Sequence, residues 1–211
     1  MDKNTISNNG YDYVDLGLPS GTLWATMNVG ASKPSDFGLY FQWGDTQGYT
    51  IDQVETSEGR KKLASDWSDY KWYLSGSGIE VKFTKYTTTG STLELEDDAA
   101  HVHMGDNWHI PSELQVRELI DNTTSEWTKQ NDVNGRLFTS KNDKSKSIFI
   151  PAAGDAWGGS VQSSGDNGGV WSSMLSTDYV DGGQSLFFVS GGVYLSNYYR
   201  CSGLSVRGVI G

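Results

Sequence analysis

Cysteine is almost absent from this chain of 211 residues, since Cys201 stands alone and has no partner for a disulfide within the chain. A domain of this length buries about 70% of its unfolded surface, so it needs no such staple. Long apolar runs are also missing, and none approaches the ~20 residues that span a bilayer. The first residues, MDKNTISNNG, lack the apolar core of a signal peptide. We therefore expect no transmembrane segment in this chain.

Positive charge is scarce as well. The chain has 16 Lys and Arg residues against 26 Asp and Glu residues, which gives a formal net charge of −10. Phosphate backbones and anionic membrane surfaces need a cationic face, because the attraction is electrostatic. This balance argues against a nucleic-acid partner.

Helical periodicity is rare, whereas glycine and aromatic residues are abundant, with 26 Gly, 8 Trp and 11 Tyr. This composition favours many short strands joined by tight turns. The polar residues 1–10 are expected to be a flexible tail, followed by one domain over 11–211. Residues 50–98 are irregular but rich in aromatics, so we expect an elaborated insert that is packed by Trp67, Trp72 and Tyr73.

A hairpin is expected near the start of the domain. The runs YDYVDLGL and TLWATMNV both alternate apolar and polar residues, and Pro19 and Gly21 suit the second and fourth positions of a type I turn between them. Val14, Leu16 and Leu18 then share one face. The run FGLYFQWGD predicts a short aromatic strand after this hairpin.

The clearest helix lies in IPSELQVRELIDN. Ser112 can cap its first turn and Gln115 completes a capping box, while Leu114, Leu119 and Ile120 are expected to form its apolar stripe.

Two strands around a lysine-rich turn are predicted in GRLFTSKNDKSKSIFIPAAG. Their core residues are expected to be Leu137, Phe138, Ile148 and Ile150.

The final third of the chain alternates aromatic residues with glycine, serine and asparagine. In SLFFVSGGVYL the two-residue period places Leu186 and Phe188 on one face, which we expect to be core, and Phe187 and Val189 on the other. Arg207 is expected to make a structural contact. The further residues that we assign to the core are Trp171, Val193, Val206 and Val209.

Several blocks carry a resemblance as a set: YVDLGLPSGTLWATMNVGA, FGLYFQWGD, EDDAAHVHMGDNWHIPSELQVRELIDN, WTKQNDVNGRLFTSKNDKSKSIFIPAAG, GVWSSML and YYRCSGLSVRGV. Over about residues 11–210 the chain resembles the Fibrobacter-type major paralogous domain, which is abundant in surface proteins of gut Bacteroidetes. The resemblance implies an α+β domain of the C-type lectin-like fold, in its formylglycine-generating-enzyme-like branch, with short twisted antiparallel sheets, few helices and long loops.

The same family includes variable proteins of diversity-generating retroelements, which display varied residues near a C-terminal motif similar to SVRGV. The resemblance implies a ligand-binding, variable region at about 171–204. Tyrosine offers a rigid contact face while serine, glycine and asparagine supply adaptable hydrogen bonds, which is the mixture that paratopes use. The residues that we expect to contact a ligand are Met174, Leu175, Asp178, Tyr179, Phe187, Val189, Tyr194, Ser196, Asn197, Tyr198, Tyr199, Cys201 and Leu204.

Metal and catalytic readings are weaker. His101, His103 and His109 lie close together in sequence and could bind a transition metal, but a solvated loop explains the segment better. The stretches SSGDNGG and GDNWH could supply oxygen ligands to calcium, and turn chemistry explains them equally well. Formylglycine-generating enzymes need a reactive cysteine pair at a copper site, from which this chain with its one cysteine departs. We expect no cofactor, no metal and no catalysis.

The sequence thus predicts a non-catalytic recognition protein whose partner is a protein or glycan on a cell or virion surface. It would act at the cell surface or after secretion, or else in a phage particle. The alternative is a structural or adhesive module of a bacterial surface assembly, with an interface in the 50–98 region.

Overall fold

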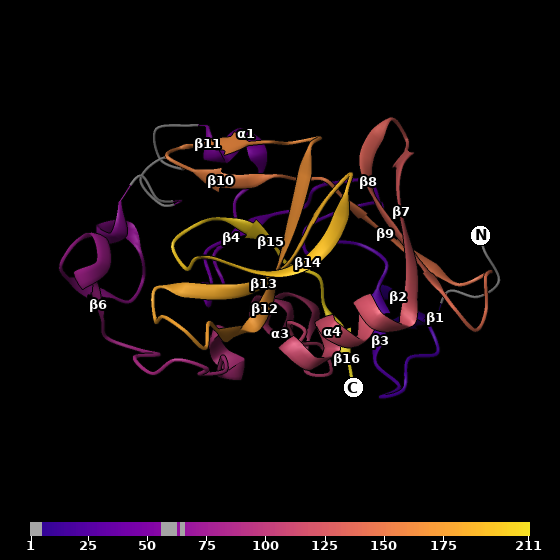
Figure 1. Cartoon of the computed structure of the whole chain (residues 1–211), viewed down its shortest axis with the longest axis horizontal. Helices are drawn as coiled ribbons and strands as arrows, with labels where there is room; N and C mark the ends of the chain where they lie inside the picture. Colours follow the sequence, from indigo (N-terminus) through magenta and orange to yellow (C-terminus); the bar gives the residue numbers. More distant parts are fainter. Residues whose placement is uncertain (1–5, 56–62, 64–65) are drawn as a thin grey trace.

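The computed structural model describes residues 6–55, 63 and 66–211, which form small, mainly antiparallel sheets with few helices (Figure 1). The strands are β1 (Ile6–Asn8), β2 (Tyr11–Asp15), β3 (Leu23–Ala25), β4 (Tyr40–Phe41), β5 (Tyr73–Ser75), β6 (Lys82–Phe83), β7 (Thr123–Gln130), β8 (Val133–Ser140), β9 (Ser147–Pro151), β10 (Asp155–Trp157), β11 (Ser160–Gln162), β12 (Asn167–Leu175), β13 (Gly182–Val189), β14 (Gly192–Tyr199), β15 (Leu204–Ser205) and β16 (Val209–Ile210). The helices are α1 (Ile51–Val54), α3 (Ala99–Met104) and α4 (Glu113–Asn122), with 3-10 turns η1 (Trp67–Asp69), η2 (Gly78–Glu80) and η3 (Leu95–Asp97). Within this part of the chain, no helix has the length and apolar character to cross a bilayer.

One sheet joins the two ends of the described chain, in the order β1-β2-β3-β16. The expectation that residues 1–10 form a flexible tail is wrong for residues 6–8, because they pair with β2 as a hairpin. The turn of this hairpin is at Asn9 and Gly10, whose φ angles are 51° and 82°. Both angles are positive, which suits the Asn-Gly pair of a two-residue hairpin. Residues 1–5 lie outside the described residues.

The hairpin of β2 and β3 is confirmed, with the turn where the sequence predicts it. The Gly21 amide donates to the Leu18 carbonyl oxygen at 2.9 Å, which closes the turn around Pro19. Leu16 and Leu18 are buried, and so is Trp24, which the alternation alone did not indicate.

Helix α4 has the predicted capping box, in which the Ser112 side chain accepts from the Gln115 amide and the Gln115 side chain accepts from the Ser112 amide. Val116 and Leu119 are the buried residues of this helix. Leu114 is 75% exposed, so its assignment to the apolar stripe was wrong. Positions two apart in an α-helix are rotated by about 200° about its axis, so Leu114 lies on the face opposite Val116.

Strands β8 and β9 are confirmed around their lysine-rich turn, and β7 adds a third strand that the sequence analysis missed. Phe138, Ile148 and Ile150 are buried as expected. Leu137 is only half-buried, because it points to the opposite face from its neighbour Phe138.

The central sheet has the order β14-β13-β12-β15-β4 and lies between two apolar clusters. Trp171 belongs to the cluster on one face, while Leu186 and Phe188 belong to the cluster on the other. The predicted core residues Val206 and Val209 are also buried. A Cβ added at Gly183 would lie 2.7 Å from Trp43 and 2.9 Å from Trp171, so this strand needs glycine where the two indoles meet.

Val193 is half-buried and packs against the same cluster as Leu186. Arg207 is fully buried and donates to the Asn28 side chain and to the carbonyl oxygens of Ala25 and Phe149 at 2.9–3.1 Å. Burial lowers its pKa. Its structural role is therefore as predicted.

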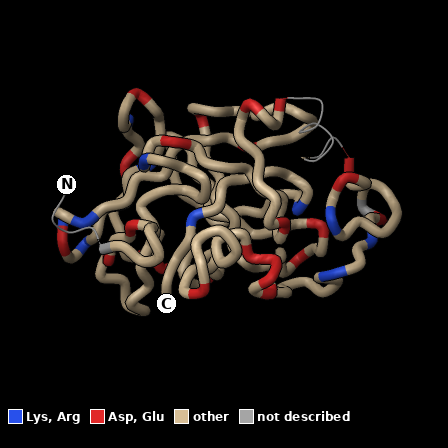
Figure 2. Tube along the Cα trace, turned by 180° about the vertical axis from the view of Figure 1, so that it is seen from behind, with Lys and Arg blue, Asp and Glu red and all other residues tan. Residues whose placement is uncertain are grey.

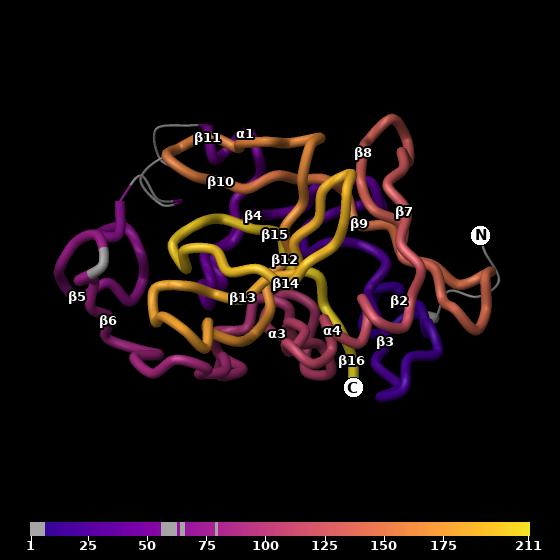
Figure 3. The backbone as a smooth tube through the Cα atoms, viewed as in Figure 1, coloured from indigo at the N-terminus to yellow at the C-terminus, as the bar shows by residue number. Residues whose placement is uncertain are grey.

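The described part of the 50–98 insert projects to one side of the molecule at β5 and β6 (Figure 3). Trp72 is buried in the first cluster, and Trp67 and Tyr73 pack against that cluster. The three rings therefore pack into the core, as the sequence predicts. Trp72 itself is only 7% exposed.

A candidate ligand-binding pocket

A pocket of about 1080 Å³ opens at the end of the central sheet. Its lining comes from the β10–β11 hairpin, the β12–β13 turn, the end of β14 and the insert. These elements lie toward the left of Figure 1. The residues that line it are Val81, Thr89, Asp155, Trp157, Gln162, Asp178, Tyr179, Val180, Asp181, Asn197, Tyr198, Tyr199 and Ser202.

The β12–β13 turn is held by one serine at its base. The Ser176 hydroxyl accepts from the amides of Asp178 and Tyr179 at 3.1 and 3.4 Å. The Ser176 amide donates to the Gly182 carbonyl oxygen at 2.8 Å, which closes the turn. Serine favours such turns because its hydroxyl bonds backbone groups a few residues away. The turn therefore presents Asp178 and Tyr179 to the pocket in a fixed arrangement.

Aromatic rings form the wall and the rim. The ring of Tyr199 lies 5.9 Å from that of Trp157, tilted by 31°, and 5.5 Å from that of Trp67 in an edge contact. Tyr199 is 52% exposed, and Tyr179, which also lines the pocket, is 45% exposed. Rings in this setting offer contact area and a polar tip at small entropic cost.

Tyr198 is the ring that joins the pocket to the core. It is half-buried, with its ring centroid 6.5 Å from Trp171 and 6.0 Å from Phe187. Burial, aided by the charge of Asp155, raises the pKa of Tyr198 to about 12. Its hydroxyl therefore stays protonated at neutral pH.

Three carboxylates, of Asp155, Asp178 and Asp181, line the pocket. Asp155 is half-buried, and burial raises its pKa above the ordinary value of 3.8. No lysine or arginine lines the pocket among the residues whose positions are described. The described lining therefore holds three acidic and no basic side chains, in keeping with the excess of acidic over basic positions along the trace (Figure 2).

Two neighbouring amide groups have oxygens without a hydrogen-bond donor. Asn197 Oδ1 on β14 and Gln184 Oε1, directly opposite it on β13, are buried without a donor among the described residues, and Gln184 does not line the pocket. A buried acceptor without a donor costs about 1–3 kcal/mol in free energy.

Arg200 anchors the insert beside this site. Its buried guanidinium donates to the Tyr70 hydroxyl at 2.7 Å and to the carbonyl oxygens of Lys85, Tyr86 and Val180 at 3.0–3.1 Å. The same guanidinium lies over several rings of the insert, at 4.2 Å from the centroid of the Phe83 ring. Because these acceptors and rings already engage it, its donors are not available to the pocket.

Nine of the thirteen residues predicted to contact a ligand lie at the pocket or along β13 and β14. Five of them, Asp178, Tyr179, Asn197, Tyr198 and Tyr199, line the pocket. Phe187, Val189, Tyr194 and Ser196 lie on β13 and β14 in the predicted outward register, with Tyr194 directly opposite Phe187. Tyr194 is 51% exposed, while the other three are half-buried.

Three predicted contact residues are core residues instead. Leu175, Cys201 and Leu204 are fully buried in the first apolar cluster, and Met174 is half-buried on β12, opposite Thr92. The resemblance placed them in the ligand-binding region, but the chain after Tyr199 enters the central sheet as β15, between β12 and β4, and these side chains pack inside the first cluster. Burial, with the charge of Asp181, raises the pKa of the Cys201 thiol to about 12, so it is protonated at neutral pH.

The sequence analysis missed the contribution of β10 and β11. Asp155, Trp157 and Gln162 come from this hairpin, and Val81 and Thr89 come from the insert. A tryptophan between glycines, in GDAWGG, is a signal that could have pointed to an aromatic side chain at a turn. The contact with β14 is long-range and has no sequence signature.

The histidine segment forms helix α3 and its following loop, not a solvated loop throughout. His103 Nε2 lies 2.9 Å from the Thr46 carbonyl oxygen, and both ring nitrogens of His109 lie 3.0 Å from backbone carbonyl oxygens. Within the described ranges, the one group of three potential ligand side chains for a metal is instead Glu94, Glu96 and Asp97.

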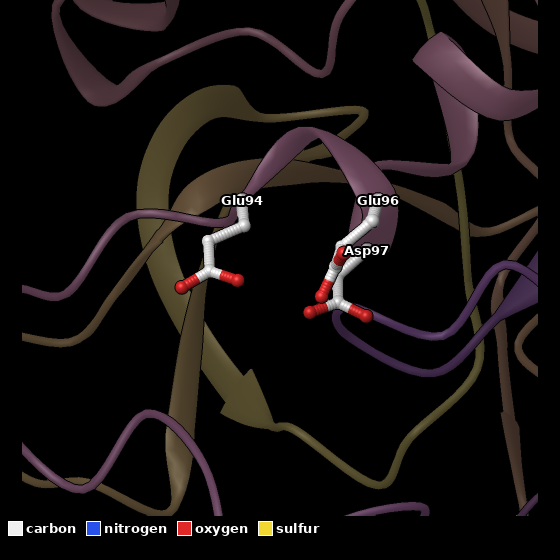
Figure 4. A group of neighbouring side chains, drawn as sticks. All are labelled: Glu94, Glu96 and Asp97. Carbon is white, nitrogen blue, oxygen red and sulfur yellow. The ribbon is translucent and has the colours of Figure 1, made fainter.

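Lysine already occupies the position of a cation in that acidic group. The three carboxyl groups converge on one side of the η3 turn (Figure 4), and the ammonium of Lys85 lies 2.6, 3.2 and 2.5 Å from Glu94, Glu96 and Asp97. Although burial opposes it, hydrogen bonds from Lys71, Lys85 and Tyr86 lower the pKa of Asp97. The cluster is a structural ion-pair network.

Comparison of the chain with family models, with curated proteins and with solved structures gives no match.

Proposed function

We propose that this chain is a non-catalytic recognition module that binds a ligand in the pocket between β10, the β12–β13 turn and the end of β14. The observation that carries this proposal is the convergence of five predicted contact residues on one pocket with two exposed tyrosines at its rim. A concave site with aromatic walls and a few polar groups is the usual form of a binding site.

The resemblance to the Fibrobacter-type major paralogous domain supports the same function. Short sheets, few helices and long loops agree with the C-type lectin-like fold that the resemblance implies. On this proposal the ligand lies on a cell or virion surface, and the chain acts at the cell surface, after secretion or in a phage particle. Residues 171–204 then serve both as scaffold strands and as the wall of the site.

The test is a selection from a random peptide library together with a glycan array, each probed with the parent chain. A double variant, Tyr179→Ala with Tyr199→Ala, removes the rim rings. Tyr194→Ala is the matched control, because Tyr194, although predicted as a contact residue, does not line the pocket. It lies on the same strand as Tyr199 and is equally exposed, at 51% against 52%.

We expect binders whose affinity falls at least about tenfold in the double variant and stays within about twofold in the control. Circular dichroism must show that both variants keep the parent fold. No binder in either library, or binders that respond to Tyr194→Ala and ignore the rim variant, would overturn the proposal.

A further inference from the structure

Strand β14 forms one edge of the central sheet. The sheet order begins with β14, and within the described ranges β13 is the strand that pairs with it. The two strands are joined by a two-residue turn, Ser190 and Gly191, which is closed by the pair of Val189 and Gly192. The closing pair of such a hairpin exchanges both backbone hydrogen bonds, and hydrogen-bonded pairs then alternate along the ladder. The even-numbered residues of β14 therefore bond to β13, and the odd-numbered residues direct their N–H and C=O groups away from it.

This edge is open. Among the residues that the structure describes, none donates to or accepts from the backbone groups of Val193, Leu195 or Asn197 on the side away from β13. Every residue of β14 is half-buried or exposed, whereas most of β13 is buried. The opposite edge of the sheet differs, because β4 has two residues and both are buried.

Strand β14 also lacks the features that normally protect an edge. Natural edge strands are short, bulged or interrupted by proline, or they carry charged side chains. The eight residues of β14, GVYLSNYY, include no charge and no proline, and their register with β13 is unbroken. Strand β7, at the edge of the three-stranded sheet, carries Glu126 and Lys129. The contrast marks β14 as a surface that can pair.

The unpaired groups identify what kind of molecule fits. An edge offers N–H donors and C=O acceptors in a row at strand spacing, and another extended backbone matches both at once. Side chains narrow the choice further. The chain has a net charge of −10, yet self-pairing of the uncharged β14 sets no like charges opposite one another along the strands. A second copy also covers both open edges in one closed, twofold contact.

We propose that two copies of this chain pair through β14, antiparallel, about a twofold axis at Ser196. In this register Leu195 of one copy exchanges backbone hydrogen bonds with Asn197 of the other. Tyr194 of one copy then lies opposite Tyr198 of the other, in a pair whose side chains are close. Tyr194 is 51% exposed, and its ring has no aromatic neighbour in the described part of the chain, so the second copy supplies one. The two central sheets become one continuous sheet.

The first test is sedimentation equilibrium of the full chain up to about 500 μM, without any ligand. We expect a reversible monomer–dimer equilibrium with a Kd on the order of 10–100 μM, because a single strand pair is a small interface. Raising the salt from about 20 to about 300 mM should lower this Kd, since it screens the repulsion between two acidic copies.

Ser196→Lys places two ammonium groups opposite each other on the axis, so we expect the Kd to rise at least about tenfold. The matched control is Thr128→Lys, which adds the same charge at a half-buried position of the edge strand β7 and should leave the Kd within about twofold. Circular dichroism must show that both variants keep the parent fold.

A pair of cysteine variants tests the register and does not depend on the lysine variants. Two Ser196→Cys chains bring their Cα atoms to about 4.5 Å, within the range of a disulfide. Two Tyr194→Cys chains hold theirs four positions apart along the strands, at about 13 Å, which no disulfide spans. In a glutathione buffer we expect a covalent dimer from Ser196→Cys at least about tenfold in excess of that from Tyr194→Cys.

Three results would overturn the proposal. A chain that stays monomeric at every concentration and salt leaves the edge to a strand of another protein. A dimer that Ser196→Lys and Thr128→Lys affect equally uses a different surface. Equal cross-linking of the two cysteine variants rules out the axis at Ser196. The proposed function is tested separately by the library selection, because these measurements contain no ligand.

Discussion

The Nε atom of Arg200 donates a hydrogen bond of 2.7 Å to the hydroxyl of Tyr70, which lies 130 positions earlier in the chain. This contact joins the end of β14 to the insert in a single buried network. The insert contributes Val81 and Thr89 to the pocket, so the same network holds the pocket wall in place.

Replacing Arg200 by methionine should destabilise the fold strongly. The variant leaves the Tyr70 hydroxyl and three carbonyl oxygens without their donor, and each unsatisfied buried group costs about 1–3 kcal/mol. We expect the free energy of unfolding in urea to fall by at least about 3 kcal/mol. The control is Arg117→Met, which breaks the pair of the exposed Arg117 with the half-buried Glu113 and should cost no more than about 1 kcal/mol. Equal effects of the two changes would contradict the anchoring role.

The tyrosines of β14 should separate into two classes of stability effect. Tyr198→Ala removes a half-buried ring that contacts Trp171 and Phe187, so we expect a loss of about 2 kcal/mol in unfolding free energy. Tyr194→Ala removes a ring that is 51% exposed and should change stability by no more than about 0.5 kcal/mol. Thermal and urea unfolding measure both, and a larger loss at Tyr194 would contradict the described burial.

Asp155→Asn should stabilise the chain at neutral pH. Because burial raises the pKa of Asp155 in the folded state, the fold disfavours its charged form, and the parent gains stability as the pH falls through that raised pKa. The asparagine variant lacks this penalty. Its advantage in melting temperature should thus be largest at neutral pH and shrink on acidification.

The groups that face Asp155 keep this experiment interpretable. Tyr40 and Tyr198 feel its charge and have raised pKa values, so both stay neutral over the acidic range. Asp178 and Asp181 line the same pocket, so the variant that carries Asp178→Asn and Asp181→Asn must be measured alongside Asp155→Asn. An advantage of Asp155→Asn that grows as the pH falls would reverse the sign that we infer.

Cys201 should be unreactive in the folded chain. Its pKa of about 12 leaves almost no thiolate at mildly alkaline pH, and the side chain is fully buried. We expect a disulfide reagent to modify it at least about 100-fold more slowly in native buffer than in denaturant. Fast native labelling would mean that this segment opens readily.

Local sequence patterns were sufficient to predict the elements that depend only on neighbouring residues. The capping box at Ser112 and Gln115, the turn at Pro19 and Gly21 and the alternation of Leu186 and Phe188 each depend on residues within a few positions. Those predictions are confirmed because short-range sterics and hydrogen bonding decide them.

Eight of the thirteen lining residues were not among the predicted contact residues. Trp157 meets Tyr199, and Thr89 meets the β12–β13 turn, only because chain segments far apart in sequence fold together. Burial also depends on the whole fold, as Leu175 and Leu204 illustrate. An alternating pattern gives two faces, and it does not say whether a later segment covers the second one.

The sheet that pairs β3 with both β2 and β16 brings the first and last strands of the described chain together. This sheet lies away from the loops around β10 and β6 (Figure 1). Attaching the molecule to a biosensor chip by a tag beside β1 or beside β16 should therefore leave the pocket accessible to the sample. If the domain gives the same binding signal whether it is attached through its N-terminal or its C-terminal side, it can be displayed from either end in a binding selection.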